Sequence, residues 1–96
     1  MIDENLIAVL AKRKIVSDTF RRLDPAKKEL VYHTAVRLFG EYGYDGLPVD
    51  RFCAEAGISK GSFFQYFPSK SHLLEFTLMS FDFELERWME QIRKQE

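Results

Sequence analysis

Apolar residues recur at intervals of three and four positions along most of the chain, which is the spacing of an amphipathic α-helix. The clearest pattern lies between residues 25 and 42. Asp24 is a good N-cap for this helix, and Pro25 suits its first position because the missing N–H group would have no partner there. Gly43 is expected to end the helix, because glycine readily adopts the left-handed geometry that follows a helix.

Two short helical patterns and one long pattern follow. Apolar side chains at positions 49, 52, 53 and 56 share one face of a helix that begins near Pro48 and ends at Gly57. Ser59 can cap a second short helix, which Pro68 must stop because proline cannot continue the hydrogen-bond ladder. Ser69 can cap a last helix that runs to about residue 95. Its expected apolar stripe consists of Leu73, Leu74, Leu78, Phe81, Leu85, Trp88, Met89 and Ile92.

The N-terminal residues carry the same helical spacing with a basic interruption. Apolar positions begin at Ile2, resume after Lys12, Arg13 and Lys14, and continue to Leu23. The pattern predicts one helix over residues 2–22. The expected fold is therefore all-α: a small helical domain preceded by an extra N-terminal helix and followed by a long connecting helix.

The two short helices joined by Gly57 have the layout of a helix-turn-helix. The small side chain of Cys53 allows a close crossing, and Gly57 can adopt the left-handed turn at little steric cost. Ile58 and Phe63 then fill the space between the helices. This packing leaves Ser59, Lys60, Ser62, Gln65 and Tyr66 on the outer side of the second short helix.

These outer side chains suit contact with DNA. Hydroxyl and amide groups can hydrogen-bond to phosphates or base edges, and Lys60 can contact phosphate or guanine. Gly61 lets the start of the helix approach a duplex closely. That start presents N–H groups and a partial positive charge to phosphate.

Residues 35–74, "AVRLFGEYGYDGLPVDRFCAEAGISKGSFFQYFPSKSHLL", resemble the DNA-binding domain of TetR/AcrR-type transcriptional repressors. The shared features are a Leu-Phe helix, a Gly-Tyr turn, an Ala-Gly-Ile-Ser segment, a Gly-Ser-aromatic segment and a Ser-Lys pair before the long helix. The matching residues are Leu38, Phe39, Gly43, Tyr44, Val49, Ala56, Gly57, Ile58, Ser59, Gly61, Ser62, Tyr66, Phe67, Ser69, Lys70 and Leu73.

The resemblance implies that the helix at about residues 59–67 enters the major groove of DNA. It implies phosphate contacts for Tyr66 and Lys70. Two departures remove hydroxyl groups that the family usually offers to phosphate: Leu47 and Pro48 precede the first short helix, and Phe64 stands where tyrosine is usual. The expected DNA-binding residues are Val49, Ser59, Lys60, Gly61, Ser62, Phe64, Gln65, Tyr66 and Lys70.

Three parts are expected along the chain, and the resemblance implies a regulatory function. Residues 1–23 form an N-terminal helical extension, residues 24–74 the helix-turn-helix domain (helix-turn-helix at about 48–67), and residues 75–96 the rest of the long helix. That helix is expected to lead to a ligand-binding and dimerisation domain absent from this chain. The implied protein is a homodimeric repressor that binds a palindromic operator in double-stranded DNA and answers to a small-molecule effector. Whether the regulator is an activator or a repressor stays open. Whether the chain is a fragment or a natural short form stays open as well.

Charge supports an alternative function. The net charge of −1 does not by itself indicate a nucleic-acid partner, which usually favours a basic domain. Acidic residues concentrate near the C-terminus. A helical protein-interaction or regulatory module that has lost specific DNA binding is therefore the alternative, and Pro48 and Phe64 support it.

The sequence contains no motif that indicates metal binding, catalysis or membrane insertion. His33 and His72 lack a neighbouring carboxylate and cysteine set, so no metal is expected, and Cys53 is expected to be a buried structural thiol. No catalytic constellation or cofactor motif appears, so an enzyme is not expected. No run of about 18 apolar residues could span a membrane, and the N-terminus lacks a signal-peptide layout, so a cytoplasmic location is expected.

Overall fold

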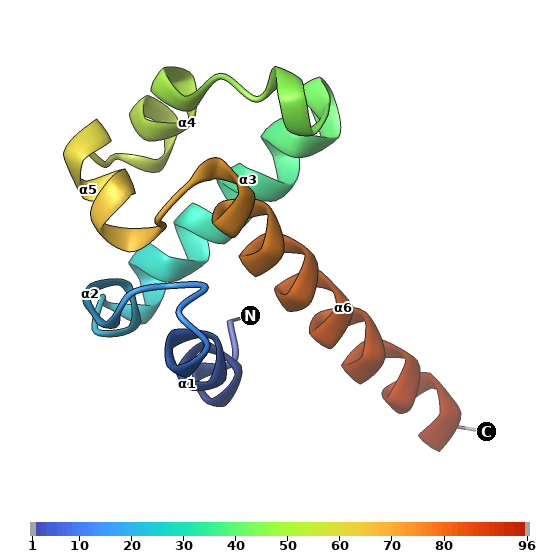
Figure 1. The fold of residues 1–96 in the computed structure, drawn as a ribbon. Coiled ribbons are helices and arrows are strands. Elements are labelled where there is room, and N and C mark those ends of the chain that lie inside the picture. The colour runs from blue at the N-terminus through green and yellow to red at the C-terminus, as the bar shows by residue number, and fades with distance from the viewer. Residues whose placement is uncertain (1, 96) are drawn as a thin grey trace.

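The computed structural model describes residues 2–95, and all regular structure in this range is helical (Figure 1). α3 runs through the middle of the molecule, between α4 and α5 on one side and α1 and α2 on the other, and α6 extends away from them (Figure 1). The all-α fold expected from the sequence is confirmed. The helices are α1 (Glu4–Lys12), α2 (Asp18–Arg21), α3 (Pro25–Gly46), α4 (Val49–Ala56), α5 (Lys60–Tyr66) and α6 (Lys70–Lys94).

Polar N-caps start three of these helices at the predicted residues. Asp24, Ser59 and Ser69 each accept a hydrogen bond from a backbone N–H group in the first turn, at 3.3, 3.0 and 3.3 Å. Each cap satisfies one donor that the helix itself leaves without a partner. Phe67 has the extended backbone expected of a residue before Pro68, with φ −130° and ψ 125°, so α5 stops where predicted.

α3 is interrupted near its C-terminal end. Gly43 has φ 73° and ψ 177°, which is outside the helical region, so the continuous helix breaks there as predicted. One more turn follows, and the helix ends at Gly46. The break redirects the chain toward α4 (Figure 1).

The N-terminal extension, residues 2–23, differs from the single helix predicted for it. α1 ends at Lys12, and α2 begins only after Ser17, whose Oγ accepts a hydrogen bond from the Phe20 N–H group at 3.1 Å. Between them, Lys14 adopts a positive φ of 63°, which is uncommon for a residue other than glycine. The break coincides with the interruption of the apolar spacing at residues 12–14, and Ile15 and Val16 are buried although they lie in a turn.

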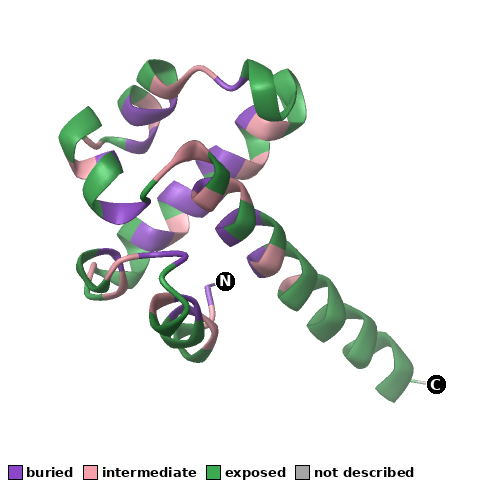
Figure 2. Ribbon diagram, viewed as in Figure 1, coloured by how far each residue is buried: buried purple, intermediate pink, exposed green. Residues whose placement is uncertain are grey.

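One hydrophobic core joins the extension to α3, α4, α5 and the first half of α6 (Figure 2). The ring of Phe20 lies among aromatic neighbours, with centroids 5.0 Å from Phe67, 5.1 Å from Phe76 and 5.8 Å from Tyr66. Such rings bury large areas and dominate the energetics of a small core. The extension contributes Ile2, Ile7, Leu10, Ile15, Val16 and Phe20 to the buried residues.

The face of α6 that packs on the core shares only Leu73 with the predicted apolar stripe. Its buried residues are Leu73, Phe76, Thr77 and Ser80, while Leu78 and most of the stripe beyond it are exposed. Thr77 can be buried because its Oγ1 donates a hydrogen bond to the Leu73 carbonyl oxygen at 2.7 Å. The second half of α6 is exposed to solvent on nearly all sides (Figure 2).

Candidate nucleic-acid interface

The turn between α4 and α5 has the geometry predicted for a helix-turn-helix. Gly57 adopts a left-handed conformation with φ 69° and ψ 34°, and the Ile58 N–H group donates to the Cys53 carbonyl oxygen at 2.9 Å. Lys27 of α3 donates from Nζ to the Gly57 carbonyl oxygen at 3.4 Å. Burial raises the pKa of the Cys53 thiol, which therefore stays protonated and serves packing, as predicted.

α5 has one buried side and one exposed side. Phe63 is fully buried, and its ring meets that of Phe52 edge-on with centroids 5.7 Å apart. This contact fixes the rotation of α5 about its own axis. The residues of α5 that remain exposed are Lys60, Gly61, Phe64 and Gln65, of which Gly61 and Gln65 lie opposite Phe63.

The first turn of α5 is closed by serine side chains. Ser59 Oγ accepts from the Ser62 N–H group at 3.0 Å and donates to Ser62 Oγ at the same distance. At Gly61 an added Cβ would meet only Ser59 Oγ, at 3.9 Å. The fold therefore does not require glycine at position 61, and its missing side chain leaves open space in front of the helix.

The two lysines of the predicted site make weak contacts that a phosphate could replace. Lys60 Nζ lies 3.3 Å from Asp50 Oδ1, with both side chains more than half exposed. Such exposed pairs contribute about 0–1 kcal/mol. Lys70 donates from Nζ to the Asp45 carbonyl oxygen at 3.3 Å and lies 5.1 Å from the centre of the Tyr44 ring.

The remaining predicted residues occupy different environments. Tyr66 is only 8% exposed and its ring packs on Phe20, whereas Phe64 is 51% exposed and rests edge-on against Phe63. Val49 is half-buried against the core at the start of α4. The structure thus brings the exposed side of α5 together as one surface, and it places Tyr66 and Val49 largely in the core.

The start of α4 has no side-chain cap. Its N-cap is Pro48, and no side chain accepts a hydrogen bond from the first turn among the described residues. The hydroxyl residue that the family pattern usually has here would satisfy one of these N–H groups. The first N–H groups of α4 therefore remain available to an anion such as a phosphate oxygen.

A cluster of charged residues between α3 and α4 was missed by the sequence analysis. Glu55 is hydrogen-bonded by Arg51 at 2.7 Å and also by Arg37, and Arg51 contacts the Tyr42 hydroxyl as well. The hydrogen bonds from Arg51 and then Arg37 lower the pKa of Glu55 below its usual value. The i,i+4 spacing of Arg51 and Glu55 was the available signal, but the partner on α3 is set by the tertiary fold.

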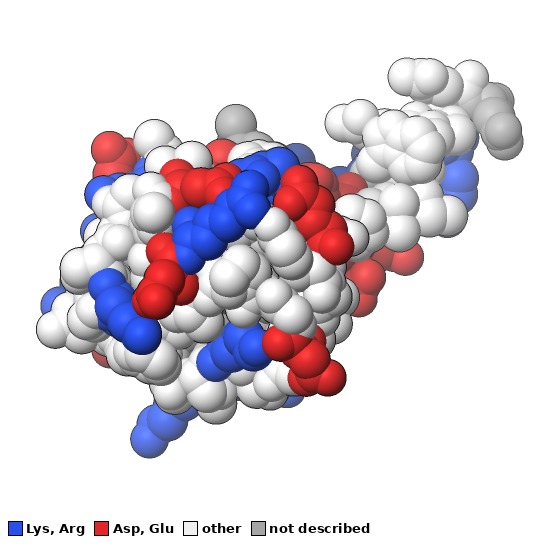
Figure 3. Space-filling view, turned by 90° about the horizontal axis from the view of Figure 1, so that it is seen from above, with Lys and Arg blue, Asp and Glu red and all other residues white. Residues whose placement is uncertain are grey.

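Charge is mixed over the end of the molecule that carries α4. Basic and acidic side chains alternate there, without one continuous basic patch (Figure 3). A partner of this region must therefore meet local positive groups and not a large positive field.

Within residues 2–95 no group of three His, Cys, Asp or Glu side chains could hold a metal ion. No helix in that range has both the length and the apolar composition to cross a membrane.

Comparison with known proteins identifies the same region. Residues 31–76 match the family model for bacterial regulatory proteins of the tetR family. Two relatives from Bacillus subtilis (strain 168) align over 48 residues: the uncharacterized HTH-type transcriptional regulators YuxN, 46% identical, and YerO, 42% identical. Each alignment spans 50% of this chain but only 16% and 17% of the two relatives. No solved structure matches the chain significantly. Residues 31–76 are therefore similar to the tetR family of bacterial regulatory proteins.

Proposed function

We propose that this chain binds double-stranded DNA through its helix-turn-helix and serves as the DNA-binding part of a transcriptional regulator. The observation that carries the proposal is the exposed side of α5, which presents Lys60, Gly61 and Gln65 to solvent. A helix with its side chains is about 10–12 Å wide, and the major groove is about 12 Å wide. Because α5 packs on the core through one side, its exposed side can enter the major groove.

The surroundings of α5 support contacts to the DNA backbone. The start of α4 has N–H groups available to a phosphate, and Lys70 lies beside the segment that leads into α4. Lys60 can exchange Asp50 for a phosphate or a base at small cost, because their ion pair is exposed. Open space at Gly61 lets the backbone of α5 come close to its partner. The residues proposed to contact DNA are Ser59, Lys60, Gly61, Ser62, Phe64, Gln65 and Lys70, with Tyr66 and Val49 at the margin.

The finer features of the regulator are part of the same proposal. The relatives are named transcriptional regulators, and the aligned segment is about one sixth of each of them. We propose that the regulator is a cytoplasmic homodimer, that it represses transcription from a palindromic operator, and that a small molecule controls it. A two-fold dimer matches a palindromic operator because each protomer then meets an equivalent half-site.

A selection from a random DNA pool tests the proposal, and two glycines provide a matched pair of variants. Gly61→Ala should weaken binding to the selected DNA, because its methyl group would occupy the space in front of α5. Gly40→Ala is the control, since a Cβ there has nothing within 4 Å and lies on α3. Lys60→Ala should weaken binding by about 1–3 kcal/mol, roughly five- to hundredfold. Fluorescence anisotropy at fixed salt measures all four proteins.

An interaction module without DNA binding is the second candidate, and one observation favours it. Phe64 presents a half-exposed apolar ring on the side of α5 assigned to DNA. If the pool yields no preferred sequence, and Lys60→Ala, Tyr66→Phe and Lys70→Ala all leave DNA affinity unchanged, this second function replaces the first.

A further inference from the structure

The turn between α1 and α2 lies beside the exposed side of α5. A groove of about 300 Å³ separates the two elements. Lys14 and Ser17 line it from the turn, and Phe64 and Gln65 line it from α5. Two residues of the proposed DNA-binding surface therefore also form one wall of a groove whose other wall belongs to the N-terminal extension.

The turn adds basic groups at this edge of α5. Lys12, Arg13 and Lys14 are consecutive and exposed, and across residues 2–95 no carboxylate pairs with any of them. Asp18 is the acidic residue that lines the groove, and its Oδ1 is engaged by Arg21 Nε at 3.2 Å. Lys14 thus lines the groove, Lys12 and Arg13 directly precede it in the chain, and the acid that lines the groove already has a partner.

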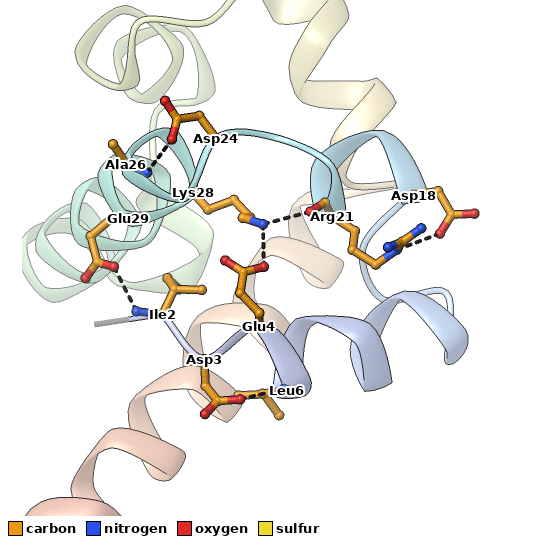
Figure 4. A network of polar contacts seen from close by, with 10 residues as sticks. All are labelled: Ile2, Asp3, Glu4, Leu6, Asp18, Arg21, Asp24, Ala26, Lys28 and Glu29. Carbon is orange, nitrogen blue, oxygen red and sulfur yellow. Dashed lines mark hydrogen bonds and ion pairs between the residues drawn. The ribbon is translucent and has the colours of Figure 1, made fainter.

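Buried contacts hold the turn in place against the domain. The Ser17 N–H group donates to the carbonyl oxygen of Tyr66, the last residue of α5, at 3.0 Å. Lys28 of α3 is 2% exposed, and its Nζ donates to Glu4 Oε1 at 2.6 Å and to the Arg21 carbonyl oxygen at 2.7 Å (Figure 4). These contacts tie the C-terminal end of the turn to α5, and the outer ends of α1 and α2 to α3. The basic residues of the turn are therefore presented from helices that are attached to the domain.

We propose that Lys12, Arg13 and Lys14 bind the phosphate backbone of DNA next to the base pairs that α5 reads. The inference rests on the proposed DNA-binding function and extends its footprint at the C-terminal end of α5. Charge complementarity selects this ligand, because guanidinium and ammonium groups without protein partners are the usual donors to DNA phosphates. Contacts of this kind raise affinity and fix orientation, but they do not change which bases are preferred.

Two variants with the same loss of charge test the inference. Lys12→Gln, Arg13→Gln and Lys14→Asn together remove the basic turn, and asparagine tolerates the positive φ at position 14. Arg87→Gln, Arg93→Gln and Lys94→Gln remove three positive charges from the exposed half of α6. Both proteins and the wild type are measured on the DNA selected from a random pool, over a range of salt concentrations. Circular dichroism checks that each retains its helix content.

The expected result is a loss confined to the turn variant. Its affinity should fall at least fivefold, and the slope of log K against log salt should become shallower by about 1–2, since each phosphate contact contributes about 0.9. Shortening the DNA flanks should weaken the wild type but not the turn variant. The base preference should stay the same.

Three outcomes overturn the inference. Equal affinities of the turn variant and the α6 variant would show that the turn makes no phosphate contact, while DNA binding through α5 stands. An equal loss by the turn variant on long and short DNA would mean that the charges act at a distance and not on the flanks. Absence of DNA binding by the wild type would remove both this inference and the proposed function.

Discussion

The helix-turn-helix and the N-terminal extension are both built from helices too short to be stable alone, yet they are attached in different ways. α5 is fixed largely by aromatic rings, with Phe63 packed against Phe52 and 5.8 Å from Phe67. The extension inserts one ring, Phe20, and adds buried polar contacts around Lys28. Apolar packing holds α5, whereas the extension is held by apolar packing and also by hydrogen bonds, whose geometry is directional.

The difference indicates what each region contributes. Because apolar packing holds α5 on its buried side, the packing does not depend on the exposed residues of this helix, and these residues can contact a ligand. Hydrogen bonds with fixed geometry orient the extension as well as hold it. The division of the chain at residue 23 remains a prediction, and residues on both sides of it share one core.

Replacing Phe20 with alanine is the change with the largest expected effect on this comparison. Removal of a fully buried phenylalanine should lower the free energy of unfolding by about 3–5 kcal/mol. Urea denaturation followed by circular dichroism measures the loss, with exposed Phe81→Ala as the control. Phe20→Leu gives a milder change if the alanine variant does not fold. A separate early transition of the extension alone would contradict the shared core.

Lys28→Met should have an intermediate effect. Methionine keeps the apolar stem but leaves the Arg21 carbonyl oxygen without its donor, while Glu4, which is half exposed, can return to water. We expect a loss of about 1–3 kcal/mol. Exposed Lys94 on α6 provides the control, because Lys94→Met should change stability by less than about 0.5 kcal/mol. Equal values for the two variants would show that the polar attachment is dispensable.

The smallest expected effect concerns Glu29, whose carboxylate accepts a hydrogen bond from the Ile2 N–H group at the start of the extension. Burial alone would raise the pKa of Glu29, but hydrogen bonds from the Ile2 N–H group and from His33 outweigh it and lower the pKa below 4.5. A carboxylate whose pKa is lowered in the folded state stabilises the fold at pH values above its ordinary pKa. This contribution disappears as the pH falls through the folded-state pKa.

Glu29→Gln should therefore reduce the loss of stability between pH 6 and pH 3 relative to the wild type. Denaturant midpoints at several pH values measure the difference. Glu75→Gln, on an exposed part of α6, is the matched control. Parallel pH profiles for the wild type and Glu29→Gln would show that the charge of Glu29 contributes nothing to holding the extension.

Local signals in the sequence were sufficient for most of the fold. Caps at Asp24, Ser59 and Ser69 and the stops at Gly57 and Pro68 depend on the chemistry of the residue itself, so they could be predicted. The break in the N-terminal segment was not predicted, although the apolar spacing is interrupted at residues 12–14, because its positive φ falls on a lysine and lysine carries no turn signal. The packed side of α6 was also missed, since buried Thr77 and Ser80 resemble exposed positions in a sequence.

The candidate site was predictable where it follows from helix geometry. With Phe63 buried, the 3.6-residue period places Gly61 and Gln65 on the opposite side of α5. Contacts between distant segments were not predictable. Nothing near Lys14 in the sequence indicates that it lies beside Gln65, because this proximity depends on how the extension packs.

The hydrogen bond from Ser17 to the last carbonyl of α5 has a consequence for motion. The amide proton of Ser17 can exchange with solvent only when that contact opens. Its exchange rate therefore reports how often the C-terminal end of α5 separates from the extension. A ligand that clamps α5 should slow exchange at Ser17 even without touching it, so one backbone amide near the start of the chain would register events at the helix-turn-helix.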